Sequence, residues 1–166
     1  MTVKQKTCAE RIHQEWEDRR NMIGDFAFAV GGVHWDCEDN DGGVCCDDLT
    51  GQETDNNFYA GERYEQHIID TYGEEALTDP LIILDSFILS ADWVEHESEF
   101  FEGAIHREYY RIQFSWGGPS DELRIYHDRV EYWFLDWFDG ASIDVTRDRA
   151  VGFLLNWFEE KIIYSG

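Results

Sequence analysis

The sequence contains few basic residues. Against 36 Asp and Glu stand 13 Lys and Arg, only three of them lysines, and the formal net charge is −23. A charge of this size repels phosphate backbones and anionic lipid surfaces, so direct binding to nucleic acid or to a membrane is not expected. Small domains stay soluble with net charges of magnitude ~2–8. The excess indicates either an acidic binding surface or adaptation to high salt, where ions screen like charges.

Long apolar runs are missing as well. No stretch approaches the ~20 apolar residues of a membrane-spanning helix, and the first residues lack the apolar core of a signal peptide. The four cysteines include the adjacent pair Cys45 and Cys46, which makes a poor disulfide framework. We therefore expect a reduced, soluble protein of the cytoplasm.

The usual signatures of catalysis and nucleotide binding do not occur. The chain has no GxSxG, GxxxxGK[ST], GxGxxG or HExxH sequence, and these carry the nucleophile, the phosphate loop or the zinc ligands in many enzymes. The pairs Gly31-Gly32 and Gly117-Gly118 are too short to cradle a phosphate and are typical of turns. The sequence favours a non-enzymatic protein without a cofactor.

Apolar residues are plentiful enough for a folded protein. They make up 43% of the chain, and aromatic residues make up 16%, which argues against disorder despite the charge. The length of 166 residues suits one domain, and no repeat or linker divides it. We expect a single acidic domain over residues 1–166, with a loop rich in Gly, Asp and Cys at about 31–57.

Apolar residues at helical spacing predict four helices. The first has Thr7 as its cap, and Glu10 three residues later completes a capping box. The third has Asp79 as its cap and Pro80 at its first position, although its early half also fits a buried strand. The four helices are expected over residues 7–22, 61–72, 79–101 and 146–163.

From Arg107 onward the apolar period changes to two, which predicts an antiparallel meander of four strands. Turns are expected at residues 117–120, at Asp128-Arg129 and at Asp139-Gly140. The expected fold is α+β, with this four-stranded meander packed against the C-terminal helix and with helices at the N-terminal end.

Carboxylates at regular spacing predict a partner-binding surface. Acidic residues three or four apart on a helix lie ~5–6 Å apart, and alternate residues of a strand lie ~6.6 Å apart. Both spacings are close to the phosphate repeat along one DNA strand, so a folded acidic domain can imitate DNA. For any single group a solvated face is the simpler interpretation. The expected carboxylates are Asp92, Glu95, Glu99 and Glu102, extended by Glu74 with Glu75, Asp136 with Asp139, and Glu159 with Glu160.

Aromatic residues are concentrated near these acids. Most of the rings are expected to form the core, but a few exposed ones beside carboxylates would anchor a protein interface, where Trp and Tyr concentrate binding energy. Trp133 and Trp137 are selected as such anchors.

Metal binding remains an alternative at two places. In the loop, His34, Cys37, Cys45 and Cys46 supply zinc ligands without zinc-ribbon spacing, and Asp39, Asp41 and Asp48 only partly match a calcium loop. Further along, carboxylates and imidazoles would converge if the third helix formed. These residues are Asp92, His96, Glu99, Glu102 and His106.

The stretch RIQFSWGGPSDELRIYHDRVEYWFLDWFDGA resembles a segment of small acidic proteins encoded by phages and plasmids among anti-defence genes. The likeness covers about Arg107 to Phe158 and brings no catalytic residues. In length and charge the chain is also similar to DNA-mimic inhibitors of restriction enzymes and CRISPR complexes. The resemblance implies a partner that is a basic DNA-binding protein or nucleoprotein complex of host defence. A homodimer, a zinc-binding enzyme or regulator, and an ordinary domain of a salt-loving organism stay open as alternatives.

Overall fold

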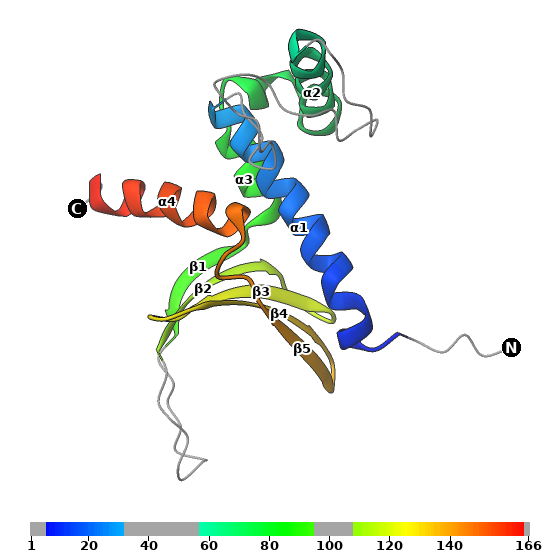
Figure 1. Cartoon of the computed structure of the whole chain (residues 1–166), viewed down its shortest axis with the longest axis vertical. Helices are drawn as coiled ribbons and strands as arrows, with labels where there is room; N and C mark the ends of the chain where they lie inside the picture. Colours follow the sequence, from blue (N-terminus) through cyan, green and yellow to red (C-terminus); the bar gives the residue numbers. More distant parts are fainter. Residues whose placement is uncertain (1–5, 32–56, 95–107, 165–166) are drawn as a thin grey trace, which may run out of the picture. The chain divides into compact units, whose positions relative to one another are not determined.

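The computed structural model describes residues 6–31, 57–94 and 108–164, with side chains in 6–31, 64–94 and 108–159 (Figure 1). Its helical elements are α1 (Cys8–Gly31), α2 (Asn57–Tyr72), the 3-10 turn η1 (Glu74–Leu77), α3 (Leu81–Phe87) and α4 (Arg149–Tyr164). Its strands are β1 (Ser90–Val94), β2 (Tyr109–Ser115), β3 (Ser120–Ile125), β4 (Val130–Asp136) and β5 (Asp139–Asp144). The fold is α+β, as predicted. Within this part of the chain, no helix is long and apolar enough to cross a membrane.

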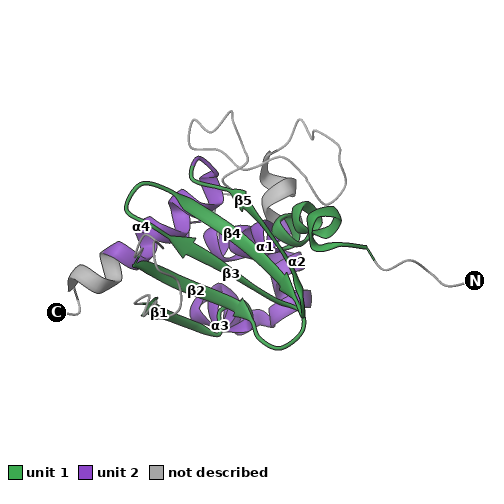
Figure 2. Cartoon of the chain, turned by 90° about the horizontal axis from the view of Figure 1, so that it is seen from below, with its two compact units in different colours: residues 1–18, 87–146 green, residues 19–86, 147–166 purple. Residues whose placement is uncertain are grey.

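The chain folds into two compact units, each assembled from segments far apart in the sequence (Figure 2). Unit 1 comprises residues 1–18 and 87–146, and unit 2 comprises residues 19–86 and 147–166. The strands all belong to unit 1, together with the first turns of α1. The described part of unit 2 is helical.

The sheet of unit 1 is an antiparallel meander with the strand order β1-β2-β3-β4-β5. It therefore has five strands, where the sequence predicts four. The additional strand, Ser90–Val94, lies inside the stretch for which a helix over residues 79–101 is expected. The helix in this stretch ends at Phe87.

The strand β1 forms by pairing with β2 at the edge of the sheet. Ser90 pairs with Gln113 and Val94 with Tyr109, so the whole of β1 lies along β2. On one face Asp92 pairs with Arg111 of β2, with 2.9 Å between Oδ2 and Nη2. Such cross-strand pairs stabilise a sheet. Because the two partners are distant in the sequence, the local spacing of apolar residues does not predict them.

One face of the sheet carries the core of unit 1. Ile112, Leu123 and Tyr132 occupy one row across β2, β3 and β4, and all three are fully buried. The first turns of α1 pack on this face, where the ring of Trp16 lies 5.0 Å from the ring of Tyr132. Burying a large apolar side chain of this kind stabilises the fold by about 1.5–3 kcal/mol.

The first turn of α1 has the predicted capping box. The backbone N–H of Thr7 donates to Glu10 Oε2 at 2.8 Å, and the backbone N–H of Glu10 donates to Thr7 Oγ1 at 3.3 Å. The helix continues beyond the predicted end near Met22 to Gly31, because Ile23 and Phe26 extend its apolar stripe and are fully buried.

Aromatic contacts dominate the core of unit 2. The ring of Phe26 lies 5.2 Å from Trp157 and 6.0 Å from Phe153, both on α4. The ring of Phe28 lies 4.4 Å from Tyr64 of α2. The second half of α1 therefore contacts both α2 and α4 within this unit.

A buried carboxylate joins α1 to α2. Asp25 of α1 is 6% exposed and accepts hydrogen bonds from Tyr64 Oη at 2.7 Å and Tyr72 Oη at 2.8 Å. The Nε2 atom of His67 lies 3.2 Å from the same carboxylate, and His67 Nδ1 lies 3.5 Å from Thr71 Oγ1. Because a buried carboxylate needs such partners, these groups fix how the two helices pack.

Candidate protein-binding surface

The predicted helical stripe of carboxylates is wrong at its first residue. Asp92 lies in strand β1 and forms an ion pair with Arg111, so it does not stand at helical spacing from the acids that follow. Those acids, Glu95, Glu99 and Glu102, lie outside the described residues, as do the candidate ligands His96 and His106.

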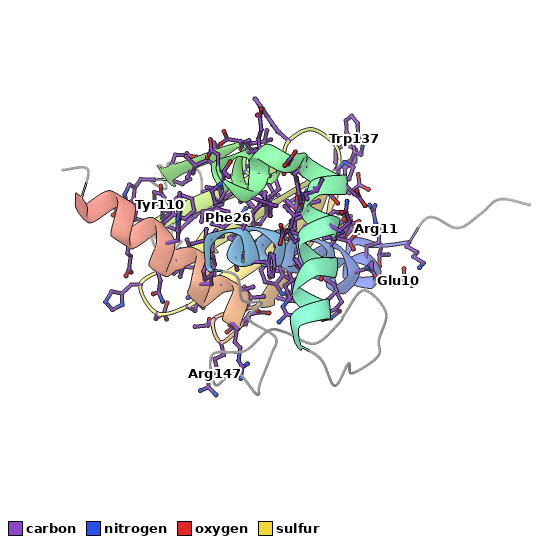
Figure 3. The ribbon with its side chains drawn as sticks, turned by 90° about the horizontal axis from the view of Figure 1, so that it is seen from above. Glu10, Arg11, Phe26, Tyr110, Trp137 and Arg147 are labelled. Carbon is purple, nitrogen blue, oxygen red and sulfur yellow. The ribbon has the colours of Figure 1, made fainter. Side chains whose placement is uncertain are left out.

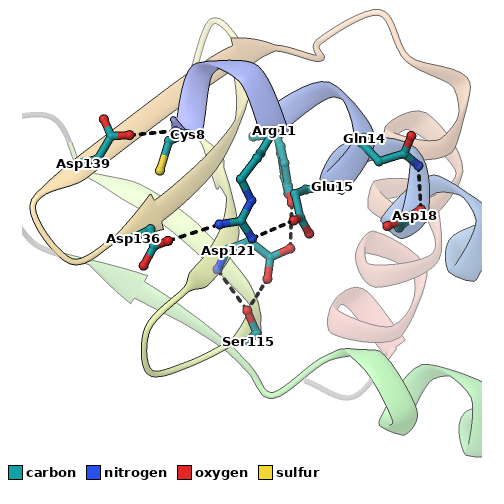
Figure 4. Close-up of polar contacts among 10 residues, drawn as sticks. Cys8, Arg11, Gln14, Glu15, Asp18, Ser115, Asp121, Asp136 and Asp139 are labelled. Carbon is teal, nitrogen blue, oxygen red and sulfur yellow. Dashed lines mark hydrogen bonds and ion pairs between the residues drawn. The ribbon is translucent and has the colours of Figure 1, made fainter. Parts of the chain in front are cut away.

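The predicted acids at the end of β4 hold α1 against the sheet (Figure 4). Arg11 Nη1 lies 3.1 Å from Asp136 Oδ2, and Arg11 Nη2 lies 3.1 Å from Glu15 Oε1. The backbone N–H of Cys8 donates to Asp139 Oδ2 at 2.7 Å. This bond lowers the pKa of the Asp139 carboxyl. Burial, followed by the contact with Asp139, raises the pKa of the Cys8 thiol.

The predicted anchor Trp133 is engaged within the protein. The guanidinium of Arg124 stacks 4.1 Å from the centre of its ring, and Trp133 Nε1 donates to Glu131 Oε2 at 2.9 Å. Arg124 also pairs with Glu122 at 2.6 Å. Burial alone would lower the pKa of Arg124, but the hydrogen bond and negative charge of Glu122, together with Tyr109 and Tyr126, outweigh burial, and the pKa is raised. This face of the sheet thus contains an arginine held between an indole and a carboxylate.

The second predicted anchor, Trp137, is 85% exposed and lies in the turn between β4 and β5 (Figure 3). Phe138 beside it is 105% exposed, and Trp116, which follows β2, is 84% exposed. In a meander the β2–β3 and β4–β5 turns lie at the same end of the sheet. We call Trp116, Trp137 and Phe138 the aromatic tip.

The β4–β5 turn, which carries two residues of the aromatic tip, has residues that are unusual for a two-residue turn. The sequence favours Asp139-Gly140 as the turn, but both residues belong to β5, and the two turn residues are Trp137 and Phe138. Two-residue turns normally contain Gly, Asn or Asp, which tolerate positive φ. Trp137 has φ of 52°, a conformation that costs a bulky residue of order 1–3 kcal/mol.

A close approach joins the two turns of the aromatic tip. A Cβ atom at Gly118 would lie 2.9 Å from Trp137 Nε1, so a residue larger than glycine at 118 would displace the indole. Gly117 has φ of +118°, which few residues other than glycine adopt. The two glycines between Trp116 and Pro119 thus let the indole of Trp137 lie over the neighbouring turn.

One groove borders the aromatic tip, and a second groove shares Lys6 with it. The first, of about 360 Å³, is lined by Lys6, Thr7 and the turn residues 136–139. The second, of about 380 Å³, is lined by Lys6 and by residues of α1. Around the two grooves the carboxylates Glu10, Glu15, Asp136 and Asp139 outnumber the cations Lys6 and Arg11.

A separate acidic surface lies on unit 2. The sequence has no Lys or Arg between Arg63 and Arg107, but it has eleven Asp and Glu there. The carboxylates of this stretch that belong to unit 2 are all exposed, and none takes part in an ion pair within the described part of the chain. We call them the acidic segment: Glu65, Asp70, Glu74, Glu75, Asp79 and Asp85.

Sequence reasoning found the acidic segment only in part. It included Glu74 and Glu75, but helical spacing favoured the carboxylates from Asp92 onward. The signal that identifies the whole segment is the run without a cation. Of the remaining predicted carboxylates, Glu159 is exposed on α4, and the side chain of Glu160 lies outside the described residues.

The candidate metal ligands of the loop, His34, Cys37, Cys45 and Cys46, lie outside the described residues, as do Asp39, Asp41 and Asp48. Where side chains are described, no three His, Cys, Asp or Glu residues come together in a way that would hold a metal ion.

Comparison of the chain with protein-family models, with curated proteins and with solved structures finds no match.

Proposed function

We propose that this chain is a non-enzymatic inhibitor that occupies the DNA-binding surface of a basic partner and excludes DNA by competition. The partner is a host defence complex, such as a restriction enzyme or a CRISPR effector, and the encounter takes place in the cytoplasm. The observation that carries the proposal is the acidic segment, a folded run of exposed carboxylates with no Lys or Arg between its members in the sequence.

The acidic segment offers negative charge on regular backbone. Glu65 and Asp70 lie on the solvent side of α2, while Tyr64 and Ile68 are buried. Glu74 and Glu75 follow directly in η1. Lysine and arginine side chains that neutralise phosphates can pair with such groups in the same way.

The charge of the whole chain supports fast binding to a cationic surface. A net charge of −23 attracts a basic groove over the ~10 Å range that 0.1 M salt leaves unscreened. Electrostatic steering of this kind raises association rate constants from about 10⁵–10⁶ to about 10⁸–10⁹ M⁻¹s⁻¹ at low salt. Such an inhibitor would bind its target rapidly, and salt would weaken its binding.

The proposal is tested by displacement of DNA. A fluorescent duplex is bound to each of a panel of bacterial restriction enzymes and CRISPR effectors at low ionic strength, and the chain is titrated in while anisotropy is recorded. The wild-type chain is expected to release the duplex from at least one complex. The variant Glu65→Gln, Glu74→Gln, Glu75→Gln, Asp85→Asn is expected to need roughly tenfold more protein, because each lost ion pair weakens binding.

The matched control keeps the charge and changes only side-chain length, with Glu65→Asp, Glu74→Asp and Glu75→Asp. It is expected to displace DNA about as well as wild type. If no complex in the panel releases DNA, or if the neutralised variant acts like wild type, the proposal is wrong.

A further inference from the structure

The aromatic tip gathers exposed rings at one end of the sheet of unit 1. Its three residues are 84% to 105% exposed, and Trp137 lies against the turn that contains Gly118. Leu89, which is 61% exposed, precedes β1 at the same end, where its N–H donates to the carbonyl of Gln113 at 2.8 Å. Several large apolar side chains exposed at one end of a strongly charged domain indicate an interaction site.

The backbone conformation of the β4–β5 turn indicates that its two aromatic side chains do not contribute to the stability of the fold. Trp137 adopts a positive φ in a turn where glycine would relieve the strain, and both turn side chains point away from the core. Residues that break a local rule in an otherwise regular sheet tend to belong to functional sites.

The charges around the tip select the partner. Four carboxylates against two cations line the two grooves, and the chain as a whole carries −23. Like charge opposes a second copy of this chain and an anionic membrane, whereas it favours a cationic partner. Exposed indoles also attract cations directly, since arginine stacks on the face of Trp.

The protein contains one such arrangement already formed. Arg124 stacks on Trp133 at 4.1 Å and pairs with Glu122 at 2.6 Å. The tip offers a second indole, that of Trp137, which is 85% exposed. An arginine supplied by a partner could stack on this ring as Arg124 stacks on Trp133.

The size of the tip fits an anchor for a protein interface. Large aromatic side chains bury ~150–250 Å² each, so three of them contribute on the order of 500–700 Å². A stable interface buries about 800 Å² per partner, with its energy concentrated in a few Trp, Tyr and Arg residues.

We propose that the aromatic tip binds an arginine-containing segment of the basic partner, with the guanidinium stacked on the exposed indole of Trp137 and attracted by the negative charge of the chain. The inference rests on the proposed function in that it takes the partner to be a basic protein. The tip supplies the apolar anchor, and the acidic segment supplies attraction at a distance.

The test uses an arginine-rich peptide of nine residues as the probe and isothermal titration at low salt as the measurement. The variant Trp137→Gly, Phe138→Ser removes both rings and gives the turn residues that tolerate positive φ, so it is expected to unfold at a temperature no lower than wild type. Its affinity for the peptide is expected to fall roughly tenfold or more.

The matched control is Trp93→Ala, which removes a 69% exposed indole near the opposite end of the sheet and is expected to leave affinity within about twofold of wild type. A nine-lysine peptide is expected to bind more weakly than the arginine peptide and to be less sensitive to the tip variant, because lysine lacks the planar stacking group.

Two results separate this inference from the proposed function. If the tip variant binds the arginine peptide like wild type while the neutralised acidic segment weakens both peptide binding and DNA displacement, the tip is not an anchor and the proposed function stands. If the tip variant loses the peptide but no complex releases DNA, the tip is confirmed as an arginine site and the partner is not a DNA-binding complex.

Discussion

Individual polar residues in this chain do structural work that their charge alone does not reveal. Asp25 binds two tyrosines and lies beside His67, Arg11 connects two carboxylates, and Asp139 accepts a backbone N–H of α1. A carboxylate with such partners is not available to a binding partner without loss of those bonds. Exposed acids with no partner in the fold are therefore better candidates for recognition.

Tyr72, which donates to Asp25, is expected to make the stability of the fold decrease at alkaline pH. Burial and the neighbouring Asp25 carboxylate raise the pKa of Tyr72 above its ordinary value near 10. A raised folded-state pKa gives stability that is complete below about pH 10 and is lost as the pH rises through the folded-state value. We expect the urea midpoint of wild type to fall between pH 9 and pH 11.

Tyr72→Phe isolates this effect. At pH 9 the variant is expected to be less stable than wild type by about 1 kcal/mol, because it lacks one hydrogen bond. Its urea midpoint is expected to change less than that of wild type between pH 9 and pH 11. An equal fall in both proteins would show that Tyr72 does not couple folding to pH in this range.

Residue exposure was only partly predictable from the sequence. Trp133 and Trp137 have similar acidic and aromatic neighbours in the sequence, yet Arg124 covers one ring and the other stands in solvent. Trp133 lies within β4, where Arg124 of the neighbouring strand reaches its ring, whereas Trp137 lies in the turn beyond β4. Sequence reasoning ranked Asp-Gly as the turn, so it missed Phe138 as an exposed ring of the turn.

At the scale of elements, the N-terminus of α1 is fixed to the β4–β5 turn. The capping box of Thr7 and Glu10 satisfies two N–H groups, and Asp139 accepts the N–H of Cys8 from outside the helix. The first turns of α1 are thereby attached to the sheet next to the aromatic tip.

This attachment makes acid stability depend on Asp139. The bond from the Cys8 N–H lowers the pKa of Asp139, so its stabilisation is present above the unfolded-state value near 3.9 and is lost as the pH falls through the folded-state value. Asp139→Asn is expected to lower the melting temperature at pH 7 and to have little effect at pH 3, as measured by circular dichroism. A difference of equal size at both pH values would contradict this role.

The elements with strong local signals were predicted well. The capping box located the start of α1, and the period of two located β2, β3 and β4. Strand β1 was missed because its identity depends on pairing with β2, and Asp92 and the acids after it also satisfy a helical period. Packing of the meander against the C-terminal helix stays a prediction.

For the whole molecule, the distribution of charge matters more than its total. The cations that belong to the sheet are engaged: Arg111 pairs with Asp92, Arg124 with Glu122, and Arg129 with Glu131. The acidic segment of unit 2 contains no cation at all. The carboxylates of the acidic segment are therefore not neutralised by ion pairs within the described part of the chain, which is the basis of the proposed function.

The most direct measurement is a competition titration on a complex that responds to the chain. The apparent dissociation constant of the chain is measured at increasing concentrations of duplex DNA and constant salt. Occupation of one surface predicts that this constant rises in proportion to DNA concentration without reaching a limit. A constant that levels off, or that does not change with DNA, would mean that both bind at once and would contradict competition for the DNA-binding surface.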